Sequence, residues 1–387
     1  MSARKTDVSQ SDVAKHKRSI NRLWVIPLAG LAVVMFLVID EWLQPSYQAK
    51  AAREWFEEVV ASSSAFYERS EVLNAFCHLE GYAVPHLIRY VNGHTSRLDK
   101  AYGAFLSMLP NRLRAALPAP RDDSYYYSRR FPALELLGYI GRLQRFKLET
   151  GEPIVKTSVA SAVPSLRIAL KDGNADIRVF AVQTLWFIGP PAGPVVPDLI
   201  KLAENPNERG ALEAVQAFGT VGPAASNAVE LLTKIAISGR ADAGAAVESI
   251  VSLGQTARSA APALVPLLSH ADERMRTRAA RALAHFGITP DDAVPALVQL
   301  RQSTNTWLKT VATLALWNRN LSDNDFKAEL TSALESEMAG PLAWSIGHLP
   351  GKATAFLPEI QRLSNHTNAD VRRIATNALR KILLNHP

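Results

Sequence analysis

Histidine and cysteine are the residue types most often used for metal binding and nucleophilic catalysis, and in this sequence they are scattered. His78, His86 and His94 recur every eight residues, a spacing too long for the i, i+4 pair of a helical metal site. Cys77, the single cysteine, lies in the apolar stretch NAFCHLEGY, which favours a small buried side chain over a nucleophile. We therefore expect no metal site and no catalytic residue.

Motifs that would bind a cofactor or activate a nucleophile are also missing. The sequence has no GxxxxGK[ST] or GxGxxG loop for phosphates and no GxSxG turn for a serine nucleophile. We therefore predict that the chain is not an enzyme, has no cofactor and has no evident small-molecule substrate.

One cluster has the composition of a protein-binding surface, because tyrosine and arginine are enriched where proteins meet. Its six residues are Arg121, Tyr125, Tyr126, Tyr127, Arg129 and Arg130. We predict that this cluster contacts a protein. The alternative interpretation is an ordinary loop whose tyrosines pack on neighbouring helices with only their hydroxyls in water.

The cluster lies in residues 41–160, a region that reads as helical but irregular. GYAVPHLIRYV, with Pro85 near its start, predicts a first helix, and FPALELLGYIGRL predicts a second helix ending at Gly141. The two together form a degenerate first repeat. Between them lies an insertion, residues 93–130, and insertions in repeat proteins often carry binding.

From residue 161 to 387 the sequence repeats with a period of about 33 residues. A proline opens each recognisable unit, an arginine often follows at +14, an alanine at +17, a large apolar residue at +21 and a glycine at +25. The opening prolines are Pro164, Pro197, Pro262, Pro295 and Pro358. Two further units, one starting near Val229 and one covering 322–354, are shortened.

Each position in the unit has a physical role. Proline is favoured in the first turn of a helix, where its missing N–H would be unpaired anyway. The +17 alanines, such as Ala181, allow two helices to approach closely. The +25 glycines, such as Gly189, are expected to end the second helix in a left-handed cap. Asp176 and Asp370 are expected to cap the second helix or to lie in its first turn.

VPSLRIALKDGNADIRVFAVQTLWFIGPPA and LPEIQRLSNHTNADVRRIATNALRKI resemble the HEAT-repeat family, in the variant of the bilin-lyase-like HEAT repeats. The resemblance implies an all-α, right-handed α-solenoid of about seven or eight helix pairs. It also implies that Asp176, Arg178, Asp370 and Arg372 form structural ladders between adjacent units.

A second feature precedes the repeats. Leu23–Ile39 is a run of seventeen uncharged residues, which spans about 26 Å as a helix. We predict a transmembrane helix at 23–40, bracketed by Trp24 and Trp42. The alternative is a cleaved secretory signal, but the sequence that follows, DEWLQPSYQ, offers no pair of small residues for cleavage.

Charge predicts the orientation of this anchor. Residues 1–22 hold +4 of the net +7, and Asp40 and Glu41 follow the apolar run. The positive-inside rule therefore places the basic tail, 1–22, in the cytoplasm and the repeat domain outside it, in the periplasm or the extracellular space. The body keeps only +3, too little for a general phosphate binder.

We therefore predict a membrane-anchored, non-catalytic scaffold that binds a protein partner. Two alternatives stay open. The first is bilin-lyase-like chromophore attachment or an enzyme accessory subunit, which the repeat variant alone suggests. The second is nucleic-acid binding, which the near-neutral body and the anchor oppose.

Overall fold

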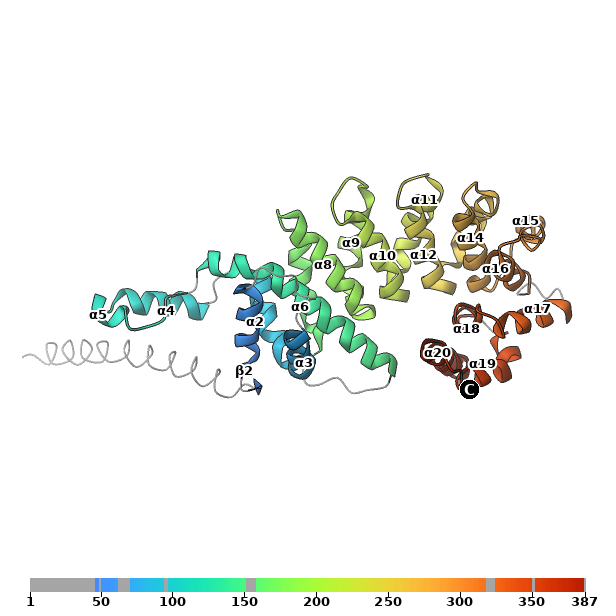
Figure 1. Ribbon diagram of the computed structural model, residues 1–387. Helices are drawn as coiled ribbons and strands as arrows, with labels where there is room; N and C mark the ends of the chain where they lie inside the picture. The colour runs from blue at the N-terminus through green and yellow to red at the C-terminus, as the bar shows by residue number, and fades with distance from the viewer. Residues whose placement is uncertain are drawn as a thin grey trace, which may run out of the picture. The chain divides into compact units, whose positions relative to one another are not determined.

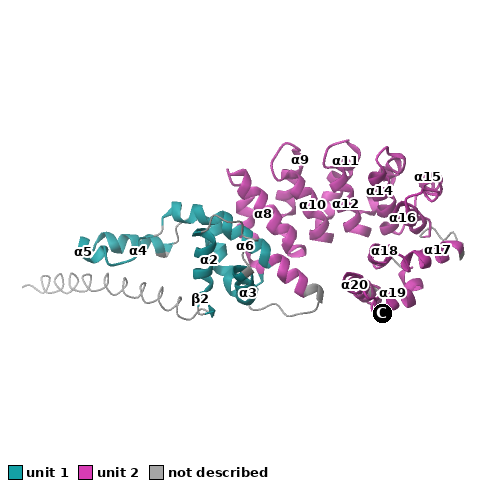
Figure 2. Cartoon of the chain, viewed as in Figure 1, with its two compact units in different colours: residues 1–140, 155–158 teal, residues 141–154, 159–387 magenta. Residues whose placement is uncertain are grey.

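The protein is all-α apart from one pair of two-residue strands in the residues that the computed structural model describes. These residues are 46–48, 50–61, 70–93, 97–120, 122–150, 158–317, 324–349 and 352–385. The chain divides into two compact units, residues 1–140 with 155–158 and residues 141–154 with 159–387 (Figure 2). Each unit is described separately below.

Unit 1 is a small helical cluster with a short antiparallel strand pair. Its elements are β1 (Ser46–Tyr47), β2 (Lys50–Ala51), α2 (Ala52–Ala61), α3 (Ser70–Asn92), α4 (Arg97–Ser107), α5 (Asn111–Arg114) and the first part of α6 (Asp123–Thr150). The expected first helix around Pro85 is the second half of α3, which kinks at Glu80. The kink has a local cause, since Pro85 lacks an N–H and its ring crowds the carbonyl of Gly81. The expected second helix is wrong at its end, because α6 continues past Gly141 to Thr150.

Unit 2 is a stack of helix pairs (Figure 1). Its first helices are α7 (Val163–Ala169), α9 (Val196–Glu204), α11 (Val229–Ile237), α13 (Ala261–Leu264), α15 (Val294–Leu300), α17 (Asn324–Leu334) and α19 (Leu357–Leu363). Its second helices are α8 (Ala175–Ile188), α10 (Ala211–Val221), α12 (Ala243–Leu253), α14 (Glu273–Phe286), α16 (Thr306–Trp317), α18 (Ala339–Ile346) and α20 (Ala369–Asn385). Seven pairs therefore lie in the described part of unit 2, in agreement with the predicted solenoid of helix pairs. The predicted right-handedness stays a prediction.

The opening prolines begin the first helices as expected. Proline occupies the first or second position of α7, α9, α13, α15 and α19. α13 ends after one turn because a second proline, Pro266, has no N–H to donate to the carbonyl of Pro262. A 3-10 turn leads into most first helices; these turns are η2 (Val159–Ala162), η3 (Pro190–Val195), η4 (Gly222–Ala228), η5 (Gly254–Ala260), η7 (Asp291–Ala293) and η8 (Ala353–Phe356), whereas η6 (Val265–Ser269) extends α13.

The +25 glycines end the second helices, but the predicted cap geometry is correct only in part. Gly287 is left-handed, with φ 66° and ψ 14°. Gly189, Gly222 and Gly254 also have positive φ, but their ψ values lie between −125° and −145°. The extended ψ directs the chain into the following 3-10 turn instead of closing a left-handed cap. Both conformations favour glycine, because a Cβ disfavours positive φ.

The +17 alanines lie where the helices meet. All five, Ala181, Ala214, Ala279, Ala312 and Ala375, have no exposed surface. Their burial agrees with the prediction that helices pack against one another at this position.

The turns inside the units show which of the two expected positions the aspartates occupy. Asn174 caps α8 by accepting a hydrogen bond from the backbone N of Asp176 at 2.8 Å, and Asn368 does the same for Asp370 at 2.8 Å. The two aspartates therefore lie in the first turn and are not the caps. In α14 the aspartate itself caps, since Asp272 accepts from the N of Arg274 at 2.9 Å.

The +14 arginines hold the same turns from the other side. Arg178 donates to the carbonyl of Asp172 at 2.7 Å. Arg276 and Arg372 donate in the same way, at 2.6–2.9 Å, to the carbonyls of the residues six and five positions before them, which are His270, Ala271, His366 and Thr367. This arginine therefore braces the turn before its own helix by donating to backbone carbonyls within that turn.

Contacts between units form only part of the implied ladder. Asp176 pairs with Arg209 at 2.8 Å and Arg178 pairs with Glu208, both in the next unit. Asp370 instead pairs with Arg373 of its own helix at 3.4 Å. The ladder is therefore present at the first of the two predicted positions and not at the second.

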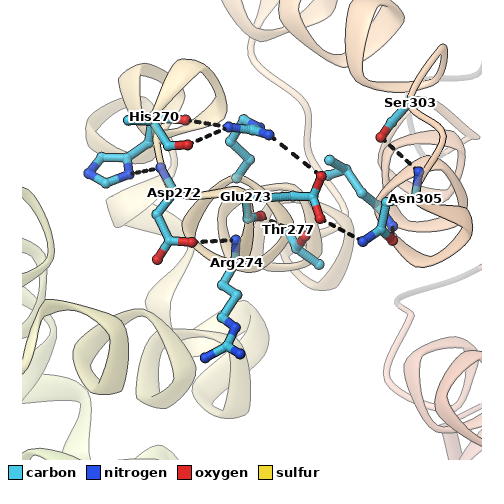
Figure 3. A network of polar contacts seen from close by, with 10 residues as sticks. His270, Asp272, Glu273, Arg274, Thr277, Ser303 and Asn305 are labelled. Carbon is cyan, nitrogen blue, oxygen red and sulfur yellow. Dashed lines mark hydrogen bonds and ion pairs between the residues drawn. The ribbon is translucent and has the colours of Figure 1, made fainter.

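Adjacent units are also linked by polar side chains outside the implied ladder. Figure 3 shows Glu273 of α14 between Arg276 of its own helix and the side-chain amide of Asn305, which precedes α16 and donates at 2.7 Å. Arg301 and Lys309 both pair with Glu329 of the following unit, at 3.0 and 2.9 Å.

The second helices pack on one another in a continuous row as far as α16, and this row is interrupted before α18. Helices α8, α10, α12, α14 and α16 pack on one another in sequence order, and so do α18 and α20. At the interruption, α16 packs on the first helix α17. This place coincides with the shortened unit expected at 322–354.

No helix in the described ranges is long and apolar enough to cross a membrane. The predicted span at 23–40 and the basic tail at 1–22 lie outside the described residues. The anchor and its orientation therefore stay predictions.

Candidate functional site

The tyrosine–arginine cluster lies at the start of α6 in unit 1. Arg121 is outside the described residues, and the other five residues belong to the helix and not to a loop. The Tyr125 hydroxyl donates to Glu57 of α2 at 2.8 Å, and its ring lies under the guanidinium of Arg129, 3.7 Å from ring centre to Cζ.

Arg129 also holds Glu57 with two hydrogen bonds, from Nε at 3.1 Å and from a terminal nitrogen at 2.6 Å. Partial burial acts to raise the pKa of Glu57, but the bonds from Arg129 and Tyr125 and the Arg129 charge outweigh it, so this pKa lies below its usual value. The three side chains therefore join α2 to α6.

Tyr126 and Arg130 are buried inside the same unit. The Tyr126 hydroxyl donates to Asp99 of α4 at 2.7 Å, and Nε of Arg130 donates to the carbonyl of Val91 at 3.1 Å. Tyr127 differs, because 57% of its surface is exposed. The packing of Tyr125 and Tyr126 agrees with the alternative interpretation of the cluster. Protein binding by these residues stays a prediction, with Tyr127 the best-exposed ring among them.

The structural role of the cluster can be measured. Replacing Glu57 with glutamine removes the charge that Arg129 faces, and we expect it to destabilise unit 1 by about 1–2 kcal/mol. Glu58→Gln is the matched control on the same helix, because Glu58 pairs with Lys50 at a well-exposed position and should cost at most about 0.5 kcal/mol. Amide hydrogen exchange of peptides from α2 and the start of α6 in the full chain measures both. Equal protection in the two variants would show that the Glu57 bonds do not hold the unit.

A second cluster lies in unit 2, at α18, the first of the second helices after the interruption of their row. The rings of His285 on α14 and Trp344 on α18 are 5.1 Å apart, and His285 stacks on His348 at 5.6 Å. We call His285, Trp344 and His348 the histidine corner. It connects α14 directly to α18, two units further along the chain.

The hydrogen bonds of the corner define its protonation. His348 Nδ1 lies 2.6 Å from the carbonyl of Trp344, and Nε2 lies 2.6 Å from the ammonium of Lys381 on α20. Nδ1 is therefore the donor and Nε2 the acceptor of a neutral ring. Burial lowers the pKa of His348 to about 4, with the charge of Lys381 adding to the shift.

His285 is more deeply enclosed. Its side chain has no exposed surface, Nδ1 lies 3.3 Å from the carbonyl of Val251, and Nε2 has no hydrogen-bond partner. Burial lowers the pKa of His285 to about 3, and the neighbouring His348, Arg281 and Lys381 add to the shift. The ring is therefore neutral near pH 7 and joins the corner as an aromatic group.

A basic groove lies beside the corner, along the exposed face of α20. It consists of two neighbouring cavities, of about 570 and 180 Å³, which share Arg373, Asn377 and Arg380. The larger is lined by Phe146, Ser364, Ala369, Arg372, Arg373, Thr376, Asn377 and Arg380, and the smaller adds Trp344, His348, Ile374, Ala378 and Lys381. Among the described residues, four basic side chains and no carboxylate line the two cavities.

The sequence indicates the basic residues of this groove, but the net charge of the whole body does not reveal them. Arg373, Asn377 and Arg380 are spaced i, i+4, i+7 and so share one helix face. The body as a whole carries only +3, but α20 alone concentrates Arg372, Arg373, Arg380 and Lys381 against one aspartate. A charge count helix by helix finds the basic residues of α20, whereas the net charge of the body does not. The histidine corner left no such signal, because its members come from helices two units apart.

Among the described residues, no group of three or more histidine, cysteine or acidic side chains is arranged to hold a metal ion. The basic groove of unit 2 suits binding of an anionic group.

One comparison with known proteins supports the repeat fold of unit 2. Residues 230–317 match a family model described as HEAT repeats. Two engineered proteins solved by the Northeast Structural Genomics Consortium are similar in structure. One is 19% identical with a TM-score of 0.41 and covers 86% of this chain and 94% of its own; the other is 23% identical with a TM-score of 0.35 and covers 58% and 97%. No curated protein matches. The finer resemblance to the bilin-lyase-like variant stays a prediction.

Proposed function

We propose that this chain is a membrane-anchored, non-catalytic scaffold that binds an acidic segment of a partner protein in the basic groove of α20. The observation that carries the proposal is the charge of the groove, whose described lining residues include four basic side chains and no acidic one. The HEAT-repeat match and the stacked helix pairs support a binding role, since solenoids of this kind present long surfaces to other proteins.

The groove offers a carboxylate-binding group on a firm backbone. Arg372 braces the turn before α20, and this fixes the start of the helix. The guanidinium of Arg373 pairs with Asp370 at 3.4 Å, and the side chain of Asp370 is 81% exposed. An exposed pair of this kind contributes little, so Arg373 can exchange Asp370 for a ligand carboxylate and bind it with two parallel hydrogen bonds. Phe146, on α6, adds an apolar wall to the larger cavity.

A polar capping face is the competing explanation, because α20 is the last described helix and terminal repeats need a wettable surface. Wetting alone requires polar groups of either sign, and mixed signs are usual on protein surfaces. A groove with basic side chains only is better explained by an anionic ligand. We favour a protein ligand over a nucleic acid, because the basic residues form one compact patch and the body carries only +3 in total.

The anchor is the second part of the proposal. The uncharged run at 23–39 and the basic residues before it support a single span with the N-terminus in the cytoplasm. The repeat units then lie outside the cytoplasm and are held near the membrane, where they bind a partner that is itself exported or membrane-bound.

Site-specific photocrosslinking in native membranes tests the groove. A benzophenone amino acid at Thr376, which lines the larger cavity, is expected to form a discrete adduct whose crosslinked peptide is rich in Asp and Glu. Charge reversal by Arg373→Glu should reduce this adduct by about tenfold or more. Arg274→Glu is the control, because Arg274 is an exposed arginine at the start of another second helix and points away from the polar network in Figure 3.

Three results would contradict the proposal. The first is an adduct that Arg373→Glu leaves unchanged, and the second is an adduct that nuclease removes, which would indicate nucleic acid. The third is catalytic turnover of a substrate by the purified chain, which would end the non-catalytic interpretation.

A further inference from the structure

The α4–α5 segment of unit 1 presents apolar side chains to solvent. Met108, after α4, is 63% exposed, and Leu113, within α5, is 57% exposed. Figure 1 shows that α4 and α5 project from the rest of unit 1. We call residues 104–116 the apolar tip.

The tip is braced from within. Nε of Arg114 donates to the carbonyl of Leu106 at 3.0 Å, and a terminal nitrogen of Arg114 donates to the carbonyl of Ser107 at 3.1 Å. The Tyr102 hydroxyl donates to the carbonyl of Pro118 at 3.0 Å and so ties both ends of the segment. These bonds keep Met108 and Leu113 at the surface and leave them no path into the core of the unit.

The tip and its flanks, residues 100–121, carry charge of one sign, and Asp99, just before them in α4, accepts a hydrogen bond from Tyr126. Residues 100–121 contain Lys100, Arg112, Arg114 and Arg121, and no aspartate or glutamate. Lys100 and Arg112 are exposed. Exposed apolar residues between basic ones, with no acidic residue, are the composition of segments that lie in the interface of an anionic bilayer.

The place of the tip in the chain indicates which surface covers it. Only residues 41–45 separate the predicted span from β1, which belongs to the same unit. Five residues reach at most about 18 Å, so unit 1 stays beside the bilayer. We propose that the apolar tip inserts Met108 and Leu113 into the headgroup region of that bilayer, while Arg112 and Lys100 contact anionic lipids. This inference rests on the membrane anchor of the proposed function.

The tip would then fix the orientation of unit 1 on the membrane, which a single span cannot do. A tethered body rotates freely about its anchor, whereas a second contact restricts it. Insertion 93–130 acquires a role different from the protein binding that was expected of it, although Tyr127 remains available for a protein.

Depth-dependent fluorescence quenching tests the inference in the full chain. The chain with Cys77→Ser is reconstituted in vesicles of phosphatidylcholine and phosphatidylglycerol at 7:3, with an NBD probe at Leu113→Cys. Doxyl-labelled lipid should quench this probe strongly. It should not quench a probe at Ile237→Cys, an equally exposed apolar position on α11 of unit 2. Arg112→Glu should lower the inserted fraction of the tip about fivefold or more, and pure phosphatidylcholine should lower it as well.

Flotation of the vesicles separates this inference from the anchor. If the chain floats with the vesicles but the probes at positions 113 and 237 are quenched equally, the insertion of the tip is wrong and the membrane anchor is not contradicted. Chain that does not float overturns both. Quenching at position 113 that Arg112→Glu and pure phosphatidylcholine leave unchanged overturns the recognition of anionic lipid. Quenching relieved by the addition of an acidic protein would reassign the tip to a protein partner.

Discussion

Replacing Gly347 with alanine is expected to lower the free energy of unfolding by about 1–3 kcal/mol, the usual cost of inserting a methyl group into a packed interface. Gly347 follows α18 at the point where this helix crosses α20. A Cβ at this position would lie 2.8 Å from both Cα and Cβ of Ala378. Backbone cannot yield as a flexible side chain does, so α18 and α20 must separate.

The choice of alanine isolates the steric effect. Gly347 has φ −61°, an ordinary helical value, so alanine is not strained by its own backbone and gains slightly in helix propensity. The cost therefore comes from Ala378 alone. The corresponding approach between α10 and α12 is made by Gly219, whose added Cβ would lie 3.1 Å from Cα of Ser249. Glycine thus marks crossings at which the second helices nearly touch.

Gly173→Ala is the control, since nothing lies within 4 Å of a Cβ at that turn. We expect it to be neutral or to stabilise by less than about 1 kcal/mol. Urea unfolding followed by circular dichroism gives the two free energies, and hydrogen exchange of α20 peptides locates the change. If Gly347→Ala and Gly173→Ala prove equally stable, the close crossing of α18 and α20 is wrong.

The repeat pattern predicted the parts of the fold that depend on a single residue and its immediate neighbours. Pro164 begins a first helix and Ala181 is fully buried at a helix crossing, because each has the same surroundings in every unit. Gly189 illustrates the limit of such reasoning. Its positive φ was predictable from the end of a helix, but its ψ depends on the 3-10 turn that follows.

The candidate sites were harder to predict because they depend on contacts between distant residues. Tyr125 and Arg129 have the composition of an interface, but Glu57, 68 and 72 residues earlier, engages both within the unit. The corner needs His285 and Trp344 to meet across an intervening unit, which a regular period does not indicate. The charges of α20 were readable from the sequence, but the groove that they line was not.

Acidification is expected to destabilise unit 2 through the histidine corner. The pKa of His285 is lowered to about 3 and that of His348 to about 4 in the folded chain, from about 6.5 when unfolded. Between these values the unfolded chain binds more protons than the folded chain, so stability falls as the pH drops below 6.5. From pH 7 to pH 5 we expect a loss of about 2 kcal/mol from each histidine.

His285→Gln should remove about half of this loss. Glutamine does not titrate, and its amide can still donate to the carbonyl of Val251, which Nδ1 of His285 contacts. The measurement is the difference in urea unfolding free energy between pH 7 and pH 5, with hydrogen exchange of α14 and α18 peptides to localise it. Carboxylates elsewhere titrate equally in both proteins, so they cancel when the two differences are compared.

His270→Gln is the matched control, because His270 is exposed in the turn before α14 and lies outside the corner. We expect it to retain the full pH dependence of the natural chain. Should His285→Gln also retain it, the proton uptake on unfolding does not come from this ring. Burial beside Lys381 keeps both rings of the corner neutral at pH 7, and we expect protonation of either ring to weaken the contact between α14 and α18. The stability of the region between α16 and α18, where the row of second helices is interrupted, therefore depends on pH, even though no ion pair is broken there.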